Sequence, residues 1–265
     1  MAPASELLIR GYTVLVTRPL NQSEELCRLI ESAGGRAVHY PVIELRPNTV
    51  TGLKSRLLTA LRESHIAIFV SRNAVRFCER MLPDAFNMLT DLTVLAVGSG
   101  TRQELLERGI AEVFYTDIGT SESLLALAPL QPGAIRGKQI VIIQGVDGRG
   151  MLQEAFGQCG AKICCVEVYR RTKPDIDPDV LKNIWQETPP DAIVVTSAEG
   201  LQNLIDMTDP ADRNRLFHIP LAVISSRLQA IALSLGFTIT PQVAATASDD
   251  GLMQALIRLF EGRYA

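Results

Sequence analysis

Short apolar runs alternate with amphipathic stretches along the whole chain, and this rhythm limits the folds that the sequence can adopt. Each run is rich in Val and Ile and is followed by small or polar residues and then by a helical pattern. The runs include those at 12–17, 66–70, 92–97, 139–143, 192–196 and 221–224. Continuous apolar strands that alternate with helices are typical of a parallel sheet covered on both faces. The sequence therefore predicts an α/β fold.

The strand–helix pattern also occurs twice. Four pairs of segments match in the same order at nearly one spacing, with Ser71 and Ser197, for example, 126 positions apart. The pairs are FVSRNAV with VTSAEGL, LAVGSGTR with LAVISSRL, TSESLLALA with SDDGLMQAL, and VLVTRPL with VIIQGVD, each with the residues that follow. Any one pair is also explained by the general likeness of short apolar strands. Together the pairs favour two Rossmann- or flavodoxin-like parallel-sheet domains.

Two extended segments, AVHYPVIELRP at 37–47 and KICCVEVYRRTKP at 162–174, interrupt the rhythm at corresponding places. Both end near proline, which disfavours helix in the residue before it. We expect them to pair as a two-stranded antiparallel linker, 38–47 with 163–173. Domain one is then discontinuous, 1–37 with 174–265, and domain two is 48–162. Such a linker leaves an interdomain cleft, a common place for a ligand.

Composition excludes several classes of function. The net charge of −3 gives no reason to expect nucleic acid, which usually requires a basic domain. Five cysteines, an odd number without a C-x-x-C pair, fit a reduced compartment, and three isolated histidines make a metal site improbable. No apolar run approaches the roughly 18 residues of a membrane span, and the start lacks the pattern of a signal peptide. We expect a cytoplasmic protein without metal and without membrane association.

Polar residues follow eight of the predicted strands, and ligands of open α/β sheets bind beyond the carboxyl ends of strands. The junctions begin at Thr17, Ser71, Gly98, Thr120, Gln144, Thr196, Ser225 and Ser248. Ser, Thr and Asp at these places also serve as ordinary helix N-caps, so each serine alone has a purely structural explanation. Collectively, helix N-termini attract anions through unpaired N–H groups and the helix dipole.

Arginines lie at or just after five of these junctions: Arg18, Arg72, Arg102, Arg149 and Arg227. Each alone fits a solvated surface residue, but arginine also pairs well with carboxylates because it is always charged and donates through two nitrogens. Several together would suit a ligand with many carboxylates. The chain has no Walker-type phosphate loop, no G-x-G-x-x-G fingerprint and no G-x-S-x-G nucleophile elbow. This pattern favours a cofactor-free reaction governed by positioning, or plain binding.

From Val14 to about Leu259 the chain resembles the uroporphyrinogen-III synthase family. The similar segments include VLVTRP at 14–19, HYPVIEL, FVSRNAV, AVGSGT, TSESLL, GVDGR, VEVYRR at 166–171, VVTSAEGL and SDDGLMQAL. The resemblance implies two α/β domains joined by a two-stranded ladder. It also implies a linear tetrapyrrole substrate with eight carboxylates, hydroxymethylbilane, and hydroxymethylbilane synthase as the partner that hands this substrate over. Enzymes of this family close that chain to uroporphyrinogen III with loss of water and inversion of the last ring.

The resemblance assigns roles to individual residues. Tyr169 matches the family's tyrosine on the crossover strand and is the candidate general acid, although it equally fits a packing residue. Thr17, Arg18, Ser71, Thr101, Ser123, Thr196 and Ser197 match positions that line the family's cleft. With the strand-end residues Arg72, Gly98, Gly145, Arg149, Ser225 and Arg227, they form the predicted substrate-binding set. One departure from the family is Gln144, where relatives often carry arginine.

Two alternatives remain open from the sequence alone. One is a two-lobed binding protein that closes on an acidic metabolite without turning it over, since a fold does not determine a function. The other is a phosphosugar or nucleotide-sugar transferase, against which the missing glycine motif counts. We expect the chain to be a monomer, because nothing in the sequence indicates a large exposed apolar face.

Overall fold

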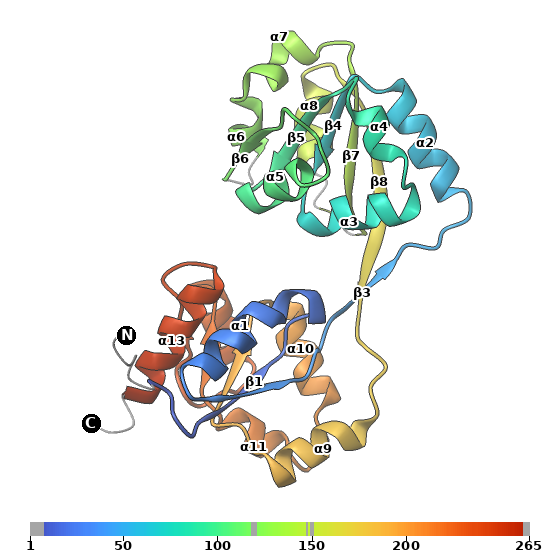
Figure 1. Cartoon of the computed structure of the whole chain (residues 1–265). Coiled ribbons are helices and arrows are strands. Elements are labelled where there is room, and N and C mark those ends of the chain that lie inside the picture. Colours follow the sequence, from blue (N-terminus) through green and yellow to red (C-terminus); the bar gives the residue numbers. More distant parts are fainter. Residues whose placement is uncertain (1–7, 118–120, 147, 149–150, 262–265) are drawn as a thin grey trace, which may run out of the picture. The chain divides into compact units, whose positions relative to one another are not determined.

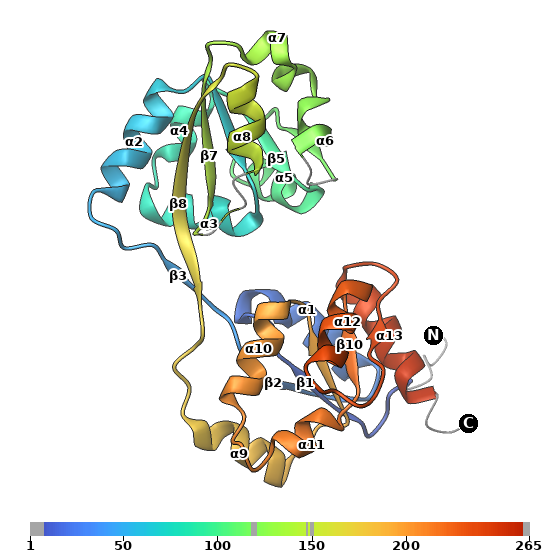
Figure 2. The same ribbon diagram turned by 180° about the vertical axis from the view of Figure 1, so that it is seen from behind.

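The computed structural model describes residues 8–117, 121–146, 148 and 151–261. The chain divides into two compact units, each with its own parallel sheet (Figures 1 and 2). Unit 1 comprises residues 1–44 and 172–265, and unit 2 comprises residues 45–171. These are the α/β class and the two parallel-sheet domains that the sequence predicts.

Unit 1 has a five-stranded sheet in the order β11-β10-β9-β1-β2, in which neighbouring strands run parallel. Its strands are β1 (Thr13–Val16), β2 (Arg36–His39), β9 (Ala192–Val195), β10 (Leu221–Val223) and β11 (Gln242–Val243). Its helices are α1 (Leu20–Ser32), α9 (Pro178–Glu187), α10 (Ala198–Met207), α11 (Arg213–Phe217), α12 (Ser226–Ser234) and α13 (Asp249–Glu261). One sheet face packs on α1 and α13, through residues such as Val14, Val194 and Leu256.

Unit 2 has a six-stranded sheet in the order β3-β8-β7-β4-β5-β6. Its strands are β3 (Glu44–Pro47), β4 (Ile66–Phe69), β5 (Thr93–Val97), β6 (Phe114–Thr116), β7 (Gln139–Gly145) and β8 (Lys162–Thr172). Its helices are α2 (Leu53–Glu63), α3 (Arg72–Met81), α4 (Ala85–Leu89), α5 (Ser99–Leu106), α6 (Ser121–Leu125), the 3₁₀ turn η1 (Ala128–Leu130), α7 (Pro132–Ile135) and α8 (Met151–Gln158).

The strands of unit 2 bury apolar side chains on both faces, as continuous apolar runs predict. Phe69 and Val141 point to the face covered by α2, α3 and α4, whereas Ile68 and Ile142 point to the other face. There they pack with Phe156 of α8 and with the α6–α7 segment. Burial on both faces leaves the strand ends as the places where polar side chains gather.

The internal repeat is confirmed by the strand order. A shift of about 126 residues carries β1, β2, β4, β5 and β6 onto β7, β8, β9, β10 and β11. Under that shift the order β2-β1-β9-β10-β11 of unit 1 becomes β8-β7-β4-β5-β6 of unit 2. The two sheets therefore have the same topology, although their first strand–helix–strand segment comes early in the chain in one unit and late in the other.

β3 and β8 run antiparallel, because Thr172 Oγ1 donates to Glu44 O at 3.4 Å while Asn48 N donates to Val168 O at 3.1 Å. This pairing joins the two segments that the sequence predicts as a linker. Most of the segment predicted as 163–173 lies in β8, which pairs with β3 on one side and with β7, from Lys162 to Tyr169, on the other. The two units divide at 44/45 and 171/172, which lie within the segments 38–47 and 163–173 that the sequence predicts as the linker.

Candidate active site

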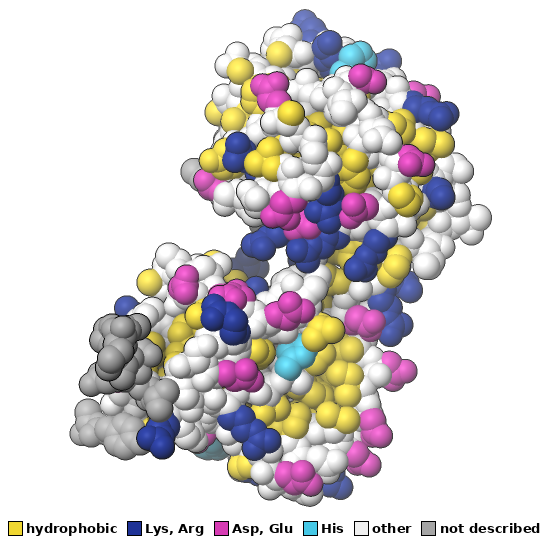
Figure 3. All heavy atoms as spheres, viewed as in Figure 1, with side chains coloured by type: hydrophobic (Ala, Val, Ile, Leu, Met, Phe, Trp, Pro, Cys, Tyr) yellow, Lys and Arg dark blue, Asp and Glu magenta, His cyan; other side chains and the backbone are white. Residues whose placement is uncertain are grey.

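Four neighbouring strands of unit 2, β8, β7, β4 and β5, bring predicted site residues to one edge of the sheet. Because these strands are parallel, the residues near their carboxyl ends lie on the same side. Tyr169 lies near the end of β8, Gly145 ends β7, Ser71 follows β4 and Gly98 follows β5. Lys and Arg side chains also gather along this edge, near α3 (Figure 3).

Tyr169 and Ser71 form the polar centre of this edge. The Tyr169 hydroxyl lies 3.2 Å from Ser71 Oγ, and either oxygen has the geometry to donate. Ser71 has extended backbone angles and caps α3, because its Oγ accepts from Ala74 N at 3.1 Å. That bond occupies a lone pair of the serine oxygen and leaves its own proton available. The serine is therefore both the predicted structural cap and a direct partner of the candidate acid.

The ring of Tyr169 is held between an aromatic side chain and a glycine. It stacks on Phe77 of α3 with ring centroids 5.3 Å apart, and Tyr169 is only 5% exposed. A Cβ built on Gly145 would lie 2.8 Å from Tyr169 Cζ, so no larger residue fits there without moving the ring. The β7–β8 register shifts between Gln144 and Gly145. Gly145 is thus required for packing, which explains its position better than direct substrate binding does.

Arg72, the first residue of α3, extends over the start of α5. A Cβ built on Gly100 would lie 2.6 Å from Arg72 Nε, so the glycine provides the space for the guanidinium. Gly98 caps α5 with φ +86°, a value that favours glycine, and Asp117 Oδ1 accepts a hydrogen bond from Ser99 N, the first amide of this helix, at 3.1 Å. The first turn of α5 and the exposed Arg72 therefore lie close together, and a carboxylate bound there would pair with Arg72 and compete with Asp117 for the first amide.

Two other residues of α5 that the sequence predicts to bind a ligand are less accessible to one. Thr101 is buried. The guanidinium of Arg102 lies over the Tyr115 ring, 5.0 Å from its centroid, and its Nε is buried without a partner among the described residues. Stacking on an aromatic ring orients Arg102 toward β6.

An ionic cluster fixes α3 and α5 relative to each other. Glu104 of α5 accepts two hydrogen bonds from Arg76 of α3, at 2.8 and 2.9 Å, and pairs with Arg108 at 2.7 Å. Burial alone would raise the pKa of Glu104, which is 6% exposed, but the hydrogen bonds and charges of Arg76 and Arg108 lower it below its usual value. Sequence reasoning missed Phe77, Gly100 and this cluster; only the glycine cluster 98–100 gave a signal.

The strand ends of unit 1 are satisfied mostly within the unit itself. The Thr17 hydroxyl donates to Val194 O at 2.7 Å. Ser197 and Ser225 cap α10 and α12, accepting from Gly200 N at 3.0 Å and Leu228 N at 3.3 Å. These three hydroxyl groups therefore have structural roles, as the N-cap explanation predicts for the two serines.

Arg18 forms an ion pair with Asp249 at the start of α13, which neutralises the charge predicted to bind a carboxylate. His39 Nε2 donates to the Arg18 carbonyl at 2.8 Å. Arg227 is exposed, and Thr196 is half-buried after β9. The structure thus leaves Arg227 as the exposed predicted arginine of unit 1.

The remaining predicted residues lie elsewhere. Ser123 is half-buried within α6. Arg149 lies outside the described residues. Gln144 is buried and lies next to Gly148. A Cβ built on Gly148 would lie 2.4 Å from the side-chain amide of Gln144.

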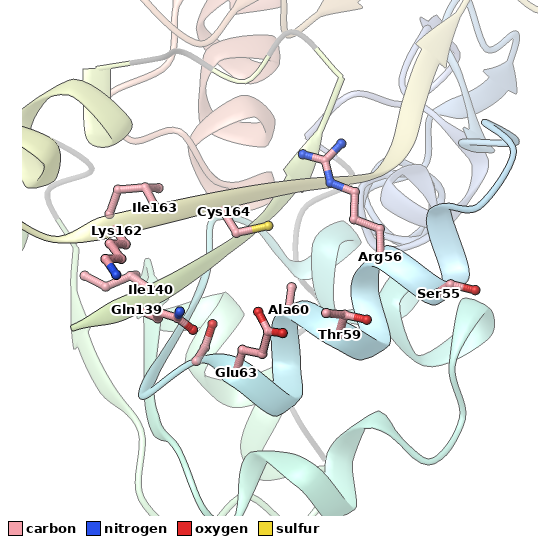
Figure 4. Close-up of a pocket in the computed structure, with 11 residues that line it drawn as sticks. Ser55, Arg56, Thr59, Ala60, Glu63, Gln139, Ile140, Lys162, Ile163 and Cys164 are labelled. Carbon is pink, nitrogen blue, oxygen red and sulfur yellow. The ribbon is translucent and has the colours of Figure 1, made fainter. Parts of the chain in front are cut away.

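A hollow of about 380 Å³ in unit 2 lies away from this edge (Figure 4). It opens between α2 and the amino-terminal ends of β7 and β8, where Gln139 and Lys162 stand. Arg56 extends from α2 to β8 and donates to Cys165 O at 2.8 Å. None of the predicted site residues lines the hollow, so it is distinct from the candidate active site.

Two classes of site are absent from the part of the chain that the structure describes. It holds no group of three or more His, Cys, Asp or Glu side chains placed to bind a metal ion. None of its helices has the length and hydropathy needed to cross a membrane.

Comparison with known proteins identifies the family. The family model described as Uroporphyrinogen-III synthase HemD matches residues 24–254. The chain is 32% identical to uroporphyrinogen-III synthase of Escherichia coli, an alignment that covers 92% of this chain and 99% of the relative. It is 31% identical to the Salmonella typhimurium enzyme over 92% and 99% of the two chains.

Solved structures agree in fold. A mutant uroporphyrinogen III synthase from Thermus thermophilus matches with a TM-score of 0.61 at 20% identity, covering 95% of this chain and 100% of that one. Uroporphyrinogen-III synthetase from Helicobacter pylori matches with a TM-score of 0.62 at 12% identity, covering 94% and 99%. The family-model match and the two full-length relatives show that the chain belongs to the uroporphyrinogen-III synthase family.

Proposed function

We propose that this chain converts hydroxymethylbilane to uroporphyrinogen III, with loss of water and inversion of ring D, in tetrapyrrole biosynthesis. The observation that carries the proposal is the 32% identity that extends over 99% of the Escherichia coli uroporphyrinogen-III synthase. The polar edge of unit 2 supports it, because this edge combines a buried phenol with groups suited to carboxylates.

The proposed reaction begins when the terminal hydroxyl of the substrate leaves as water, which leaves a cationic azafulvene. The carbon that carried the hydroxyl then bonds to the substituted position of ring D and gives a spiro intermediate. The spiro ring reopens and closes again with ring D inverted, and a proton is lost. Water is the only by-product and no net oxidation occurs, so the conversion needs no redox cofactor.

Tyr169 is the proposed source of the proton that leaves with the hydroxyl. Its hydroxyl is paired with Ser71 Oγ at 3.2 Å and its ring is fixed by Phe77 and Gly145, which limits the directions in which the proton can point. A phenol is a weak acid at neutral pH, so the contribution of Tyr169 as a general acid is on the order of tenfold to a hundredfold. Most of the selectivity then comes from holding the flexible chain in one geometry.

Carboxylate side chains of the substrate are proposed to bind at the first turns of α3 and α5 and to Arg72. Both helices present backbone N–H groups at this edge, and at α5 the substrate carboxylate would replace Asp117, which accepts from Ser99 N at 3.1 Å. In unit 1, Arg227 is the proposed cationic contact, whereas Arg18 would first have to leave Asp249. The monomeric state and the cytoplasmic location stay predictions.

The test is a product analysis with freshly generated hydroxymethylbilane, because this substrate closes unaided to the symmetric isomer I. After oxidation, isomers I and III are separated by chromatography and compared with a control without protein. Isomer III above that control is the expected result. Isomer I alone, from folded protein, would contradict the proposal and favour a non-catalytic protein that binds an acidic metabolite.

A further inference from the structure

A second hollow of about 380 Å³ lies wholly within unit 1 and shares no residue with the predicted substrate site. Residues 173–178, helix α9 and residues 206–213, which connect α10 with α11, surround it. Tyr40, directly after β2, also contributes to its wall. The hollow is therefore built from segments that are far apart in the sequence.

Trp185 of α9 provides the first sign of a ligand. It lines the hollow and is 2% exposed, and its indole N–H has no hydrogen-bond partner among the described residues. A buried donor without an acceptor is destabilising and uncommon in folded proteins. Because Trp185 lines the hollow, we infer that an acceptor atom bound there supplies the missing partner.

The indole is also held in place. The guanidinium of Arg215 lies over the Trp185 ring, 5.9 Å from its centroid, and Nη1 donates to the Trp185 carbonyl at 2.8 Å. Tyr40, the other aromatic residue of the hollow, is buried as well, and this burial raises the pKa of its hydroxyl. The two rings thus form a rigid aromatic wall with polar atoms that stay neutral.

The charged residues of the hollow are predominantly acidic. Five aspartates line it, together with three cations. The aspartates are Asp175, Asp179, Asp206, Asp209 and Asp212, and the cations are Lys173, Lys182 and Arg213. Within the described chain no ion pair joins these aspartates to the cations. With Arg215 on the Trp185 ring, negative charge still exceeds positive charge around the aromatic wall, and Asp206 and Asp209 each accept a hydrogen bond from a neutral group, Gln202 Nε2 and Ala211 N.

This arrangement discriminates between kinds of cation. No three of the acidic side chains, among described residues, come close enough to hold a metal ion. Dispersed carboxylates suit an organic ammonium group better. An ammonium group has no lone pair, however, and so gives the Trp185 N–H nothing to bond.

We propose that this hollow binds a small organic ammonium compound that also carries a hydroxyl or carbonyl oxygen. The ammonium group lies among the aspartates, and the oxygen accepts the hydrogen bond of Trp185 Nε1. The ligand class follows from the two requirements together, because neither a simple polyamine nor a neutral sugar meets both.

Trp185 is the only tryptophan of the chain, so its intrinsic fluorescence reports directly on the hollow. The full chain is titrated at mildly acidic pH with glucosamine, which has both an ammonium group and hydroxyls. Glucose lacks the charge and putrescine lacks the oxygen. A saturable change with glucosamine, at lower concentration than with either comparison compound, is expected. No saturable change, or equal changes with all three, would overturn the proposal.

Variants test the two contacts separately, with affinities measured by calorimetry. Trp185→Phe keeps an aromatic ring but removes the donor, and should weaken glucosamine binding about fivefold, as the loss of one hydrogen bond implies. Asp179→Asn should weaken it as well, whereas Asp84→Asn, an exposed aspartate of unit 2, should leave it unchanged. Because Asp179 is exposed, its variant is expected to fold even if the Trp185 variant does not.

Unchanged affinity in folded Trp185→Phe would refute the indole contact. Equal losses in the Asp179 and Asp84 variants would show general charge attraction and refute the site. Neither result depends on whether the chain makes isomer III, since the two sites share no residue.

Discussion

The two units have one strand order but different chemistry at the strand ends. Ser71 in unit 2 and Ser197 in unit 1 are equivalent, and each caps its helix through the amide three residues later. In unit 2 the Tyr169 hydroxyl joins that serine, at 3.2 Å. The equivalent position in unit 1, 126 residues earlier, is Ile43, whose side chain lies beside Gly200 of α10.

The next junction differs in the same way. In unit 2, Arg72 lies over Gly100, whereas unit 1 has Ala198 and Ser226 at the equivalent positions and cannot form this contact. Unit 1 instead pairs its strand-end arginine, Arg18, with Asp249. The repeat has thus kept the serine caps at Ser71 and Ser197, while the phenol of Tyr169 and the arginine that lies over a glycine, Arg72, occur in unit 2. The comparison teaches that the caps belong to the fold and that the additions in unit 2 are the candidates for chemistry.

The largest effect is expected from Gly145→Ala. A Cβ at this position would lie 2.8 Å from Tyr169 Cζ and would displace the ring from Ser71. Misplacing a reacting group by about 1 Å costs on the order of a hundredfold in rate. Overpacking of this kind also destabilises by roughly 1–3 kcal/mol. The rate of isomer III formation and the melting temperature measure the two effects.

Gly157→Ala is the matched control, because no described atom lies within 4 Å of a Cβ built there in α8. Alanine is the better helix former by about 1 kcal/mol, so this variant should melt slightly higher at full activity. Wild-type turnover in Gly145→Ala would show that the position of Tyr169 is unimportant.

Tyr169→Phe should lower turnover by about tenfold to a hundredfold without abolishing it, because a general acid contributes an amount of this order. The stacking on Phe77 is retained, so the melting temperature should change little. Tyr115→Phe, a change of an exposed phenol on β6, should leave turnover unchanged. Complete loss in folded Tyr169→Phe would make the phenol indispensable. Unchanged turnover would reduce Tyr169 to a packing residue.

Glu104→Gln tests the ionic cluster of unit 2, which unit 1 lacks because it has Ala230 at the equivalent position. Leaving the partly buried arginines without their carboxylate should cost about 1–3 kcal/mol at neutral pH. The pKa of Glu104 is lower in the folded state, so its stabilisation is present above the unfolded pKa of about 4.3 and is lost as the pH falls through the folded value.

The difference in melting temperature between wild type and Glu104→Gln should therefore shrink as the pH is lowered below this range. Glu25→Gln, which breaks the exposed pair with Arg28, is the control and should have little effect. A difference in melting temperature between wild type and Glu104→Gln that stays constant into strong acid would show that the charge of Glu104 is not what stabilises the two helices.

The sequence predicts the fold of this chain well, because apolar period and repeat spacing report directly on buried strands. It also places Tyr169, Ser71 and Gly145 at one edge, since parallel strands end on the same side. It does not reveal that Arg18 meets Asp249, because that pairing joins residues 231 positions apart. Nor does it show Phe77 or Glu104, whose roles depend on the way α3 packs on α5. The residue types at a strand end can be read from a short stretch of sequence. Side-chain pairing, in contrast, joins residues that are far apart in the sequence.

Ser71→Ala and Ser197→Ala separate capping from chemistry, since the two serines occupy equivalent positions. Each variant loses one N-cap hydrogen bond and should lose about 1 kcal/mol of stability. Only Ser71→Ala also removes the partner of the Tyr169 hydroxyl, so only this variant should lower turnover, by about fivefold if one hydrogen bond positions the phenol. Thermal melts and isomer III formation are measured on both. Equal turnover in the two variants, at equal stability, would mean that Ser71 is a cap and nothing more, and that the phenol takes its orientation from Phe77 and Gly145 alone.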